Sequence, residues 1–329
     1  MEYRTLGGSG LQASVIGLGT WAVGGGPWWG PTDEEEAVRA IQAAIDAGVN
    51  LIDTAPAYGF GKSEELVGKA IRGRRDRVVL ATKCGLIWDD SRGSPFFSLE
   101  GRSIHRSLRP DTIREEIEGS LRRLGVDCID VYQTHWPAIP PEATPIADTM
   151  ACLLELQRQG KIRAIGASNV TCQQMDEYRA VGRLDVCQPR YSMLDRRIEA
   201  EVLPYCLRHA IATLVYSPLE QGLLTGRIGM DRTFLPGEYR NMIPWFKPEN
   251  RRRVLEMLEG WRDLCHAYSC TLGQLVLAWT IAQPGITVAL VGARKAAHAA
   301  ENAGAGELRL DEATLARMRR DVEALGQPA

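Results

Sequence analysis

The sequence lacks a long hydrophobic run and any strong excess of charge. None of its 329 residues belongs to an uninterrupted apolar stretch of roughly 18 residues, the length that a transmembrane helix needs. Residues 1–7 also lack the apolar centre of a secretory signal peptide. Lysine and arginine number 39 and aspartate and glutamate 41, so the formal net charge of -2 gives no reason to expect nucleic acid or an acidic membrane as a partner. We expect a soluble, cytoplasmic protein.

The cysteines form no C-x-x-C pair and no cluster with histidine at the spacing of a zinc site. Histidine, aspartate and glutamate show no metal-ligand spacing either, which argues against a metal-dependent barrel hydrolase. Scattered single cysteines predict reduced thiols, most of them in the core. The eight are Cys84, Cys128, Cys152, Cys172, Cys187, Cys206, Cys265 and Cys270.

Short β-rich runs alternate with helical patterns from one end of the chain to the other, which is typical of a parallel sheet with helical crossovers. The predicted strands are residues 14–19, 50–54, 78–83, 128–135, 163–168, 186–191, 212–217 and 286–291. Eight such strands fit an α/β fold of the (β/α)8 TIM barrel type. No Pro/Ser-rich linker divides the chain, so residues 1–329 are predicted to form one domain, with a long loop over about residues 226–248.

Helix boundaries can be read from local capping chemistry. Thr32 and Glu35 have the spacing of a capping box before an apolar helix that ends at Gly48. Ser63, followed by two glutamates, is predicted to open the second helix. A third helix with apolar residues at helical spacing is predicted to end at Gly125.

Four polar side chains lie at the carboxyl ends of predicted strands, where a barrel carries its active site. Asp53 lies at the end of the second strand and Tyr58 just after it, Lys83 ends the third, and His135 ends the fourth. Each residue alone is most often a solvated rim group or an ordinary hydrogen-bonding residue. Their joint placement indicates catalysis.

These four residue types suit the reduction of a carbonyl group. A tyrosine with a pKa of about 10 is a poor proton donor at neutral pH unless a cation lies beside it. Lys83 would stabilise the phenolate, and Asp53 would keep Lys83 charged. His135 would position the carbonyl oxygen, which leaves Tyr58 as the proton donor.

A dinucleotide-binding motif is present but misleading. Residues 17–22 (GLGTWA) match G-x-G-x-x-A after a strand, yet a lone match is a weak signal. A Rossmann turn also requires a helix to begin at once, and residues 24–31 (GGGPWWGP) cannot begin one. The segment is better interpreted as the first barrel strand and its loop.

The motifs together resemble the aldo-keto reductase family, close to its bacterial general-stress and inositol-operon-associated branch. Residues 53–59 (DTAPAYG), 81–83 (ATK) and 133–137 (QTHWP) match the family's catalytic tetrad positions, and the resemblance covers nearly the whole chain. It implies the (β/α)8 barrel, a cofactor extended across the strand ends, Tyr58 as the acid, and a monomer.

The resemblance also implies which residues bind NADP(H). The nicotinamide end is assigned to Thr20, Trp21, Asp53, Ser168, Asn169, Gln188 and Tyr216. The pyrophosphate is assigned to Ser217, Pro218, Leu219, Gln221, Gly222 and Leu224. The adenosine and its 2′-phosphate are assigned to Gly292, Ala293, Arg294, His298, Glu301 and Asn302. Two charged residues, Glu220 and Arg190, have no role that the resemblance explains.

A preference for NADP(H) over NAD(H) rests on Arg294. Arg294 follows the eighth predicted strand, and no acidic residue occurs between Gly292 and His298. Its planar guanidinium group can donate paired hydrogen bonds to a phosphate. An NAD-specific site would instead be expected to present a carboxylate to the free ribose hydroxyl.

The predicted function is the NADPH-dependent reduction of aldehydes or ketones to alcohols by direct hydride transfer. His135 and four tryptophans would line the substrate side, namely Trp28, Trp29, Trp88 and Trp136. The alternative is a redox-sensing regulatory subunit, because potassium-channel β subunits share this fold and site. A panel of aldehydes tested with NADPH would separate the two.

Overall fold

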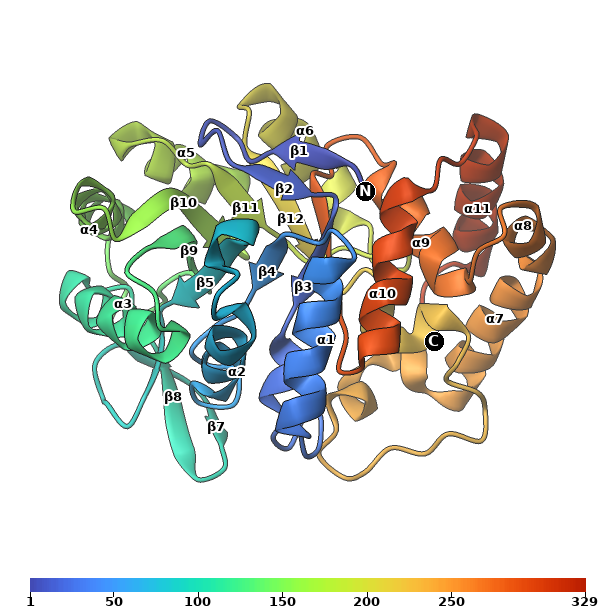
Figure 1. Ribbon diagram of the computed structural model, residues 1–329, viewed down its shortest axis with the longest axis horizontal. Helices are drawn as coiled ribbons and strands as arrows, with labels where there is room; N and C mark the ends of the chain where they lie inside the picture. The colour runs from blue at the N-terminus through green and yellow to red at the C-terminus, as the bar shows by residue number, and fades with distance from the viewer.

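Eight short runs of mostly apolar residues form parallel strands that close into a barrel (Figure 1). The computed structural model describes residues 1–329. Around the barrel the strands are β3 (Ile16–Gly19), β4 (Leu51–Asp53), β5 (Val79–Cys84), β9 (Ile129–Thr134), β10 (Ile162–Ser168), β11 (Val186–Gln188), β12 (Ala212–Tyr216) and β13 (Val288–Gly292). Each predicted strand is present, and the (β/α)8 TIM barrel prediction is confirmed.

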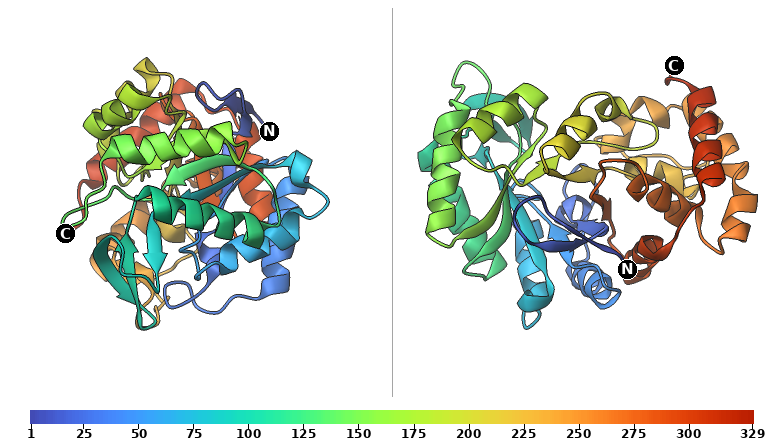
Figure 2. Two further views of the ribbon diagram at one scale, coloured as in Figure 1. Left: turned by 90° about the vertical axis from the view of Figure 1, so that its left-hand side faces the viewer. Right: turned by 90° about the horizontal axis from the view of Figure 1, so that it is seen from above.

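Helices surround the barrel on its outer side (Figure 2). Seven helices lie between successive barrel strands and an eighth follows the last strand: α1 (Glu34–Asp46), α2 (Lys62–Ile71), α3 (Pro110–Leu124), α4 (Ile146–Arg158), α5 (Cys172–Val181), α6 (Val202–Arg208), α9 (Leu272–Ile281) and, after β13, α10 (Ala296–Gly304). Three more helices lie together at one side: α7 (Pro248–Glu259), α8 (Arg262–Ala267) and α11 (Glu312–Leu325). No helix combines the length and apolar character that crossing a bilayer requires.

Two helix starts differ from the sequence prediction. The N-cap of α1 is Asp33, whose carboxylate accepts the Glu36 amide at 2.9 Å, so the predicted capping box of Thr32 and Glu35 is wrong. The carboxylate of Asp33 is the better acceptor for a helix amino terminus. Helix α2 begins at Lys62, and Ser63 is buried, where it donates to Thr20 rather than capping the helix. The predicted end at Gly125 is confirmed, with φ of 66°.

The apolar side chains fall into two layers because strand residues alternate between faces. Leu51, Val79 and Val131 point into the barrel, whereas Ile52 and Leu80 pack under the helices. An amino-terminal hairpin, β1 (Tyr3–Thr5) and β2 (Gln12–Ser14), lies across the amino ends of the strands (Figure 2). Its apolar side chains join the inner layer, so this end of the barrel is closed.

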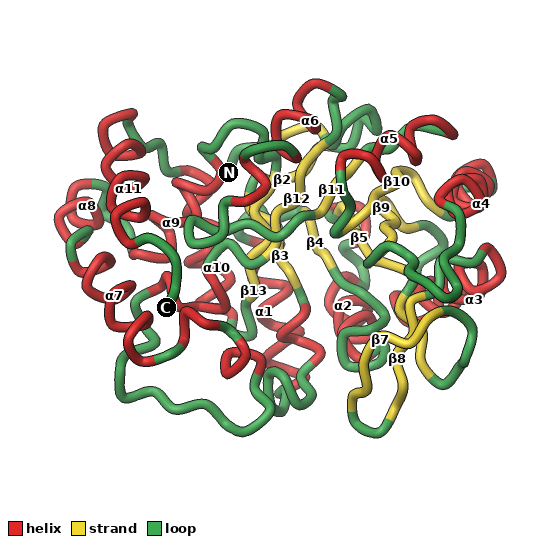
Figure 3. Tube along the Cα trace, turned by 180° about the vertical axis from the view of Figure 1, so that it is seen from behind, coloured by secondary structure: helices red, strands yellow, loops and turns green.

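The opposite end carries two large excursions (Figure 3). After β5, the chain forms an antiparallel sheet of β6 (Leu86–Trp88), β7 (Ser94–Leu99) and β8 (Arg102–Arg106), which the sequence did not predict. After β12, residues 226–247 form the predicted long loop, interrupted only by short 3-10 turns. The space between these excursions lies over the carboxyl ends of the barrel strands.

Candidate active site

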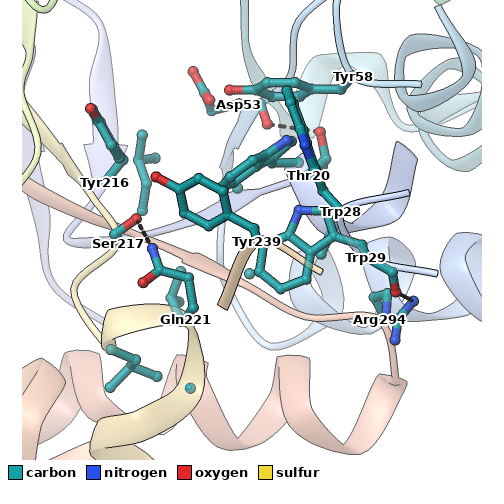
Figure 4. Close-up of a pocket in the computed structure, with 18 of the residues that line it drawn as sticks. Thr20, Trp28, Trp29, Asp53, Tyr58, Tyr216, Ser217, Gln221, Tyr239 and Arg294 are labelled. Atoms are coloured by element: carbon teal, nitrogen blue, oxygen red, sulfur yellow. Dashed lines mark hydrogen bonds between the residues drawn. The ribbon is translucent and has the colours of Figure 1, made fainter. Parts of the chain in front are cut away.

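A pocket of about 680 Å³ opens at the carboxyl ends of the strands (Figure 4). It extends from Tyr58 and His135 at one end to Arg294 and Asn302 at the other. Every cofactor and substrate residue predicted from the sequence lines it, apart from Leu224. Lys83 lies directly behind the pocket wall, in contact with Tyr58.

Leu224 is the exception, because its side chain does not reach the pocket. Residues 220–225 wind as a tight 3-10 segment, and Leu224 is fully buried in the outer apolar layer. Its amide donates to the Leu219 carbonyl at 3.2 Å, so the backbone is committed within the segment as well.

The four predicted catalytic residues meet at the end of the barrel. The Lys83 ammonium lies 2.6 Å from Asp53 Oδ1 and 3.2 Å from the Tyr58 hydroxyl, and it donates to the Thr54 carbonyl at 2.9 Å. The rings of Tyr58 and His135 lie edge to face, with centroids 5.6 Å apart. One phenol and one imidazole therefore face the same part of the pocket.

Two glutamines complete the environment of Asp53. Gln133 and Gln188 donate to Asp53 Oδ2 at 3.1 and 2.8 Å. Gln133 was not predicted from the sequence, although its place two residues after the inward-facing Val131 on β9 points its side chain into the barrel. Gln188 was assigned to the nicotinamide, but its amide nitrogen also donates to Gln133 Oε1 at 3.2 Å. Only its carbonyl oxygen is left for a ligand.

Charge and burial set the protonation states of Lys83 and Tyr58. Burial by itself would lower the pKa of Lys83, but Asp53 and Tyr58 raise it above its ordinary value, so the ammonium stays charged. Burial raises the pKa of Tyr58 above 10.0, although Lys83 opposes that change. The phenol is therefore protonated at neutral pH, in the form that a proton donor needs.

His135 is neutral in the same environment. Burial, with the positive charge of Lys83 adding to it, lowers the pKa of His135 well below 6.5. A neutral imidazole beside Tyr58 can donate one hydrogen bond to a carbonyl oxygen without competing as the acid.

Two glycines fix the backbone around Tyr58. Gly59 has a φ of 65°, and a Cβ there would lie 2.3 Å from the Gly24 carbonyl oxygen. A Cβ on Gly24 would lie 2.6 Å from the Tyr58 carbonyl carbon. The loop after β3 can pack directly on Tyr58 only because both positions lack a side chain.

Polar groups along the pocket floor are connected. Asn169 accepts the Tyr216 hydroxyl at 2.8 Å and donates to the His135 carbonyl at 3.0 Å. Further along, Gln221 donates to Ser217 Oγ at 2.8 Å, while its Oε1 is buried with no partner in the protein. A buried acceptor of this kind needs a donor, and ribose hydroxyls of an extended dinucleotide would supply one.

The unexplained charges Glu220 and Arg190 form an ion pair. Glu220 is buried and also accepts the Ser192 hydroxyl at 2.8 Å. Glu220 and Gln221 both have positive φ values, 46° and 50°, in the backbone region that non-glycine residues avoid. The ion pair therefore anchors a strained turn beside the pocket.

The far end of the pocket holds several charged groups. Arg294 Nη1 donates to the carbonyls of Trp29 and Pro31 at 3.0 and 3.2 Å. The Glu301 carboxylate is occupied by Arg227 at 2.6 Å and by the Thr271 hydroxyl at 2.8 Å. Arg227 and Thr271 were not singled out in the sequence, because their position beside Glu301 depends on how the long loop folds back.

Aromatic rings form the wall near Tyr58, as the sequence predicted for the tryptophans. The Trp21 ring lies 5.7 Å from Trp28, 5.1 Å from Trp29 and 5.0 Å from Tyr239, between centroids. The unpredicted sheet adds further apolar residues to this wall, namely Leu86, Phe96, Phe97, Leu99 and Ile104.

Residues 15–322 match the sequence profile of the Aldo/keto reductase family. The chain belongs to this family. The resemblance seen in the motifs is confirmed, and with it an oxidoreductase that acts on carbonyl compounds with a nicotinamide cofactor.

Individual relatives of this aldo-keto reductase cover almost its full length. It is 47% identical to the NADH-specific methylglyoxal reductase of Escherichia coli (strain K12). This alignment of 327 residues covers 99% of each of the two chains. The structure of glycerol dehydrogenase AKR11B4 from Gluconobacter oxydans matches with a TM-score of 0.88 and 36% identity, covering 99% of this chain and 96% of that one. An aldo/keto reductase from Klebsiella pneumoniae, solved in complex with NADP and acetate, matches with a TM-score of 0.73 and 28% identity over 97% and 95%.

The cysteines take no part in this site. All eight are free, and four of them are buried: Cys84, Cys152, Cys187 and Cys206. Burial raises the pKa of Cys84 well above 9.0, so this thiol next to Lys83 is not a nucleophile at neutral pH.

The first prediction concerns Lys83. Lys83→Met leaves the Asp53 carboxylate buried without its cation and raises the pKa of Tyr58 further, so we expect turnover to fall roughly 10²- to 10⁴-fold. With Tyr58 as the predicted acid-base group, alcohol oxidation would use the phenolate, and its rate should begin to rise at a higher pH in the variant. A pH-rate profile for oxidation that matches the wild type would show that Lys83 does not tune Tyr58.

The second prediction concerns pH in the wild-type enzyme. With Tyr58 as the predicted proton donor, the rate of reduction should be maximal below the pKa of Tyr58 and lost as pH rises through that value, which lies above 10.0. His135 titrates well below 6.5, so kcat should be flat between about pH 6.5 and pH 9. An inflection near pH 6.5 that disappears in His135→Gln would show that the imidazole is ionised in the working enzyme.

Proposed function

We propose that this aldo-keto reductase reduces aldehydes or ketones to alcohols with NADPH, and that Tyr58 is the proton donor. The observation that carries the proposal is the contact between the Tyr58 hydroxyl and the buried Lys83 ammonium, at 3.2 Å. A protonated phenol beside a fixed cation can release its proton to an oxygen that gains negative charge.

Each of the four residues has a separate task in this proposal. Bound NADPH supplies the hydride that adds to the carbonyl carbon. His135 holds the carbonyl oxygen by a hydrogen bond, and Tyr58 transfers its proton to that oxygen. Lys83 stabilises the resulting phenolate, while Asp53 holds Lys83 in place at 2.6 Å. These steps need no metal ion and no covalent intermediate.

The pocket suits an extended dinucleotide. Its polar groups run from Asn169 beside His135, through the unpartnered Gln221 Oε1, to Arg294 and Asn302. This order agrees with a nicotinamide near Tyr58 and an adenosine at the far end. The catalytic and cofactor roles of these residues are proposals that binding measurements can test.

The preference for NADPH rests on the charges at the adenosine end, because the relatives differ: one is named as NADH-specific and another was solved with NADP. Arg294 uses only Nη1 within the protein, which leaves Nε and Nη2 for a phosphate. Glu301, the carboxylate that could favour a free ribose hydroxyl, is already engaged by Arg227 and Thr271.

We further propose that residues 1–329 act as one barrel domain and as a cytoplasmic monomer. The near-neutral net charge of -2 supports a small-molecule substrate rather than nucleic acid or an acidic membrane surface as the partner.

The proposed reaction can be tested with Tyr58→Phe. The purified wild type should oxidise NADPH when supplied with a panel of aldehydes. The variant should keep its cofactor affinity and lose roughly 10²- to 10⁴-fold in turnover, because only the proton donor is removed. Tyr239→Phe removes a hydroxyl from the same pocket and serves as the control, with a much smaller expected loss. Wild-type turnover in Tyr58→Phe would rule out this tyrosine as the donor.

The cofactor preference can be tested with Arg294→Ala. Loss of a charge-assisted contact should weaken NADPH binding by roughly ten- to hundredfold and change NADH binding little. Both cofactors would be titrated by quenching of tryptophan fluorescence. Lys295→Ala, which removes the neighbouring charge, is the matched control. An equal loss for both cofactors, or tighter binding of NADH by the wild type, would overturn the assignment.

A further inference from the structure

The sheet of β6, β7 and β8 presents one face to the substrate end of the pocket. Residues paired directly across an antiparallel ladder have side chains on the same face. Trp88 pairs with Ile104, and both line the pocket. Leu86 also lines it and pairs with Arg106, so Arg106 belongs to this face of the sheet; its side chain lies behind the pocket wall and does not itself line the pocket.

Arg106 is packed between two aromatic residues of the pocket wall. Its guanidinium carbon lies 3.8 Å from the centroid of Phe96 and 4.9 Å from that of Trp136. A register shift in β7 between Pro95 and Phe97 leaves Phe96 as an extra residue, which lets both phenylalanines line the pocket. Trp136 directly follows His135, so Arg106 lies close to the catalytic end.

Arg106 has no anionic partner in the protein. It makes no salt bridge and no side-chain hydrogen bond, and its Nε is buried without a partner. Every other arginine that is at least partly buried makes a salt bridge or a side-chain hydrogen bond. On the same face of β8, Arg102 stacks on Phe60 but pairs with Asp89 at 2.9 Å.

The pocket itself offers no carboxylate that could serve Arg106. Asp53 and Glu301 are the only acidic residues that line it. Asp53 is bound to Lys83, and Glu301 lies at the adenosine end with Arg227. A half-buried cation without a counter-ion is costly, and an anion that enters the pocket would relieve that cost.

We propose that Arg106 binds an anionic group of the carbonyl substrate, a carboxylate or a phosphate, so that the substrates of this enzyme are aldehydes or ketones that carry a negative charge. A guanidinium stacked flat on aromatic rings keeps the N–H groups of its edge, which can form paired hydrogen bonds with either anion. The inference rests on the proposed function, because it assigns a substrate class to the same pocket.

The competing interpretation is that Arg106 only attaches the sheet to Trp136 by stacking. Matched substrates separate the two. We would measure kcat/KM at saturating NADPH for 4-carboxybenzaldehyde against benzaldehyde, and for glyceraldehyde 3-phosphate against glyceraldehyde. The first pair tests a carboxylate and the second a phosphate.

The wild type should prefer the charged member of at least one pair, and added salt should reduce that preference. In Arg106→Met, which keeps the length of the side chain, the charged-to-neutral ratio of kcat/KM should fall about ten- to hundredfold, mainly through KM. Arg106→Lys, which keeps the charge but not the planar fork, should recover part of the ratio. Arg102→Met is the matched control on the same strand face and should leave the ratio near that of the wild type.

Three results would overturn the inference. One is a wild type that reduces the neutral aldehydes better than both charged ones. Another is an Arg106→Met variant that loses activity equally for both members of each pair, which would identify a packing role only. The third is a wild type inactive on all four aldehydes, which would remove the proposed function and this inference together. In the first two cases the proposed function stands.

Discussion

The ion pair of Lys83 and Asp53 is the interaction on which the rest of the site depends. A buried ammonium and a buried carboxylate are stable only when each is fully compensated, and here they lie 2.6 Å apart. The remaining oxygen of Asp53 is held by Gln133 and Gln188, so strands β4, β5, β9 and β11 all contribute to one charged centre. Tyr58 is tuned from outside this centre, by contact with Lys83.

Much of this arrangement could be predicted from the sequence because barrel strands place their last residues at one rim. Asp53, Lys83 and His135 were recognisable as polar groups after apolar runs, and the eight strands followed from the same runs. The role of Gln133 was not recognisable, since an amide inside a strand gives no sign of which buried group it will meet. The burial of Leu224 was not recognisable either, because the turn of residues 220–225 is held by the Arg190–Glu220 pair, which joins segments 30 residues apart.

The sheet of β6, β7 and β8 was not predicted for a physical reason. A proline in β7 and the register shift beside Phe96 break the alternation by which a strand is recognised. The same irregularity gives the pocket its extra aromatic ring and leaves Arg106 beside it. The segments that vary most from the regular pattern are therefore those that shape the substrate end, as expected when loops carry specificity on a constant scaffold.

The closed amino end of the barrel has a consequence for the movement of protons. Below Asp53 and Lys83 the interior is filled by apolar residues, and the side chains of Leu6 and Leu11 seal the bottom. The residues of this inner cluster are all apolar and can pass on no proton. In the proposed reaction, the proton that Tyr58 gives up would therefore be replaced through the mouth, where substrate and cofactor would enter. Each catalytic cycle then needs that mouth to admit water once the product has gone.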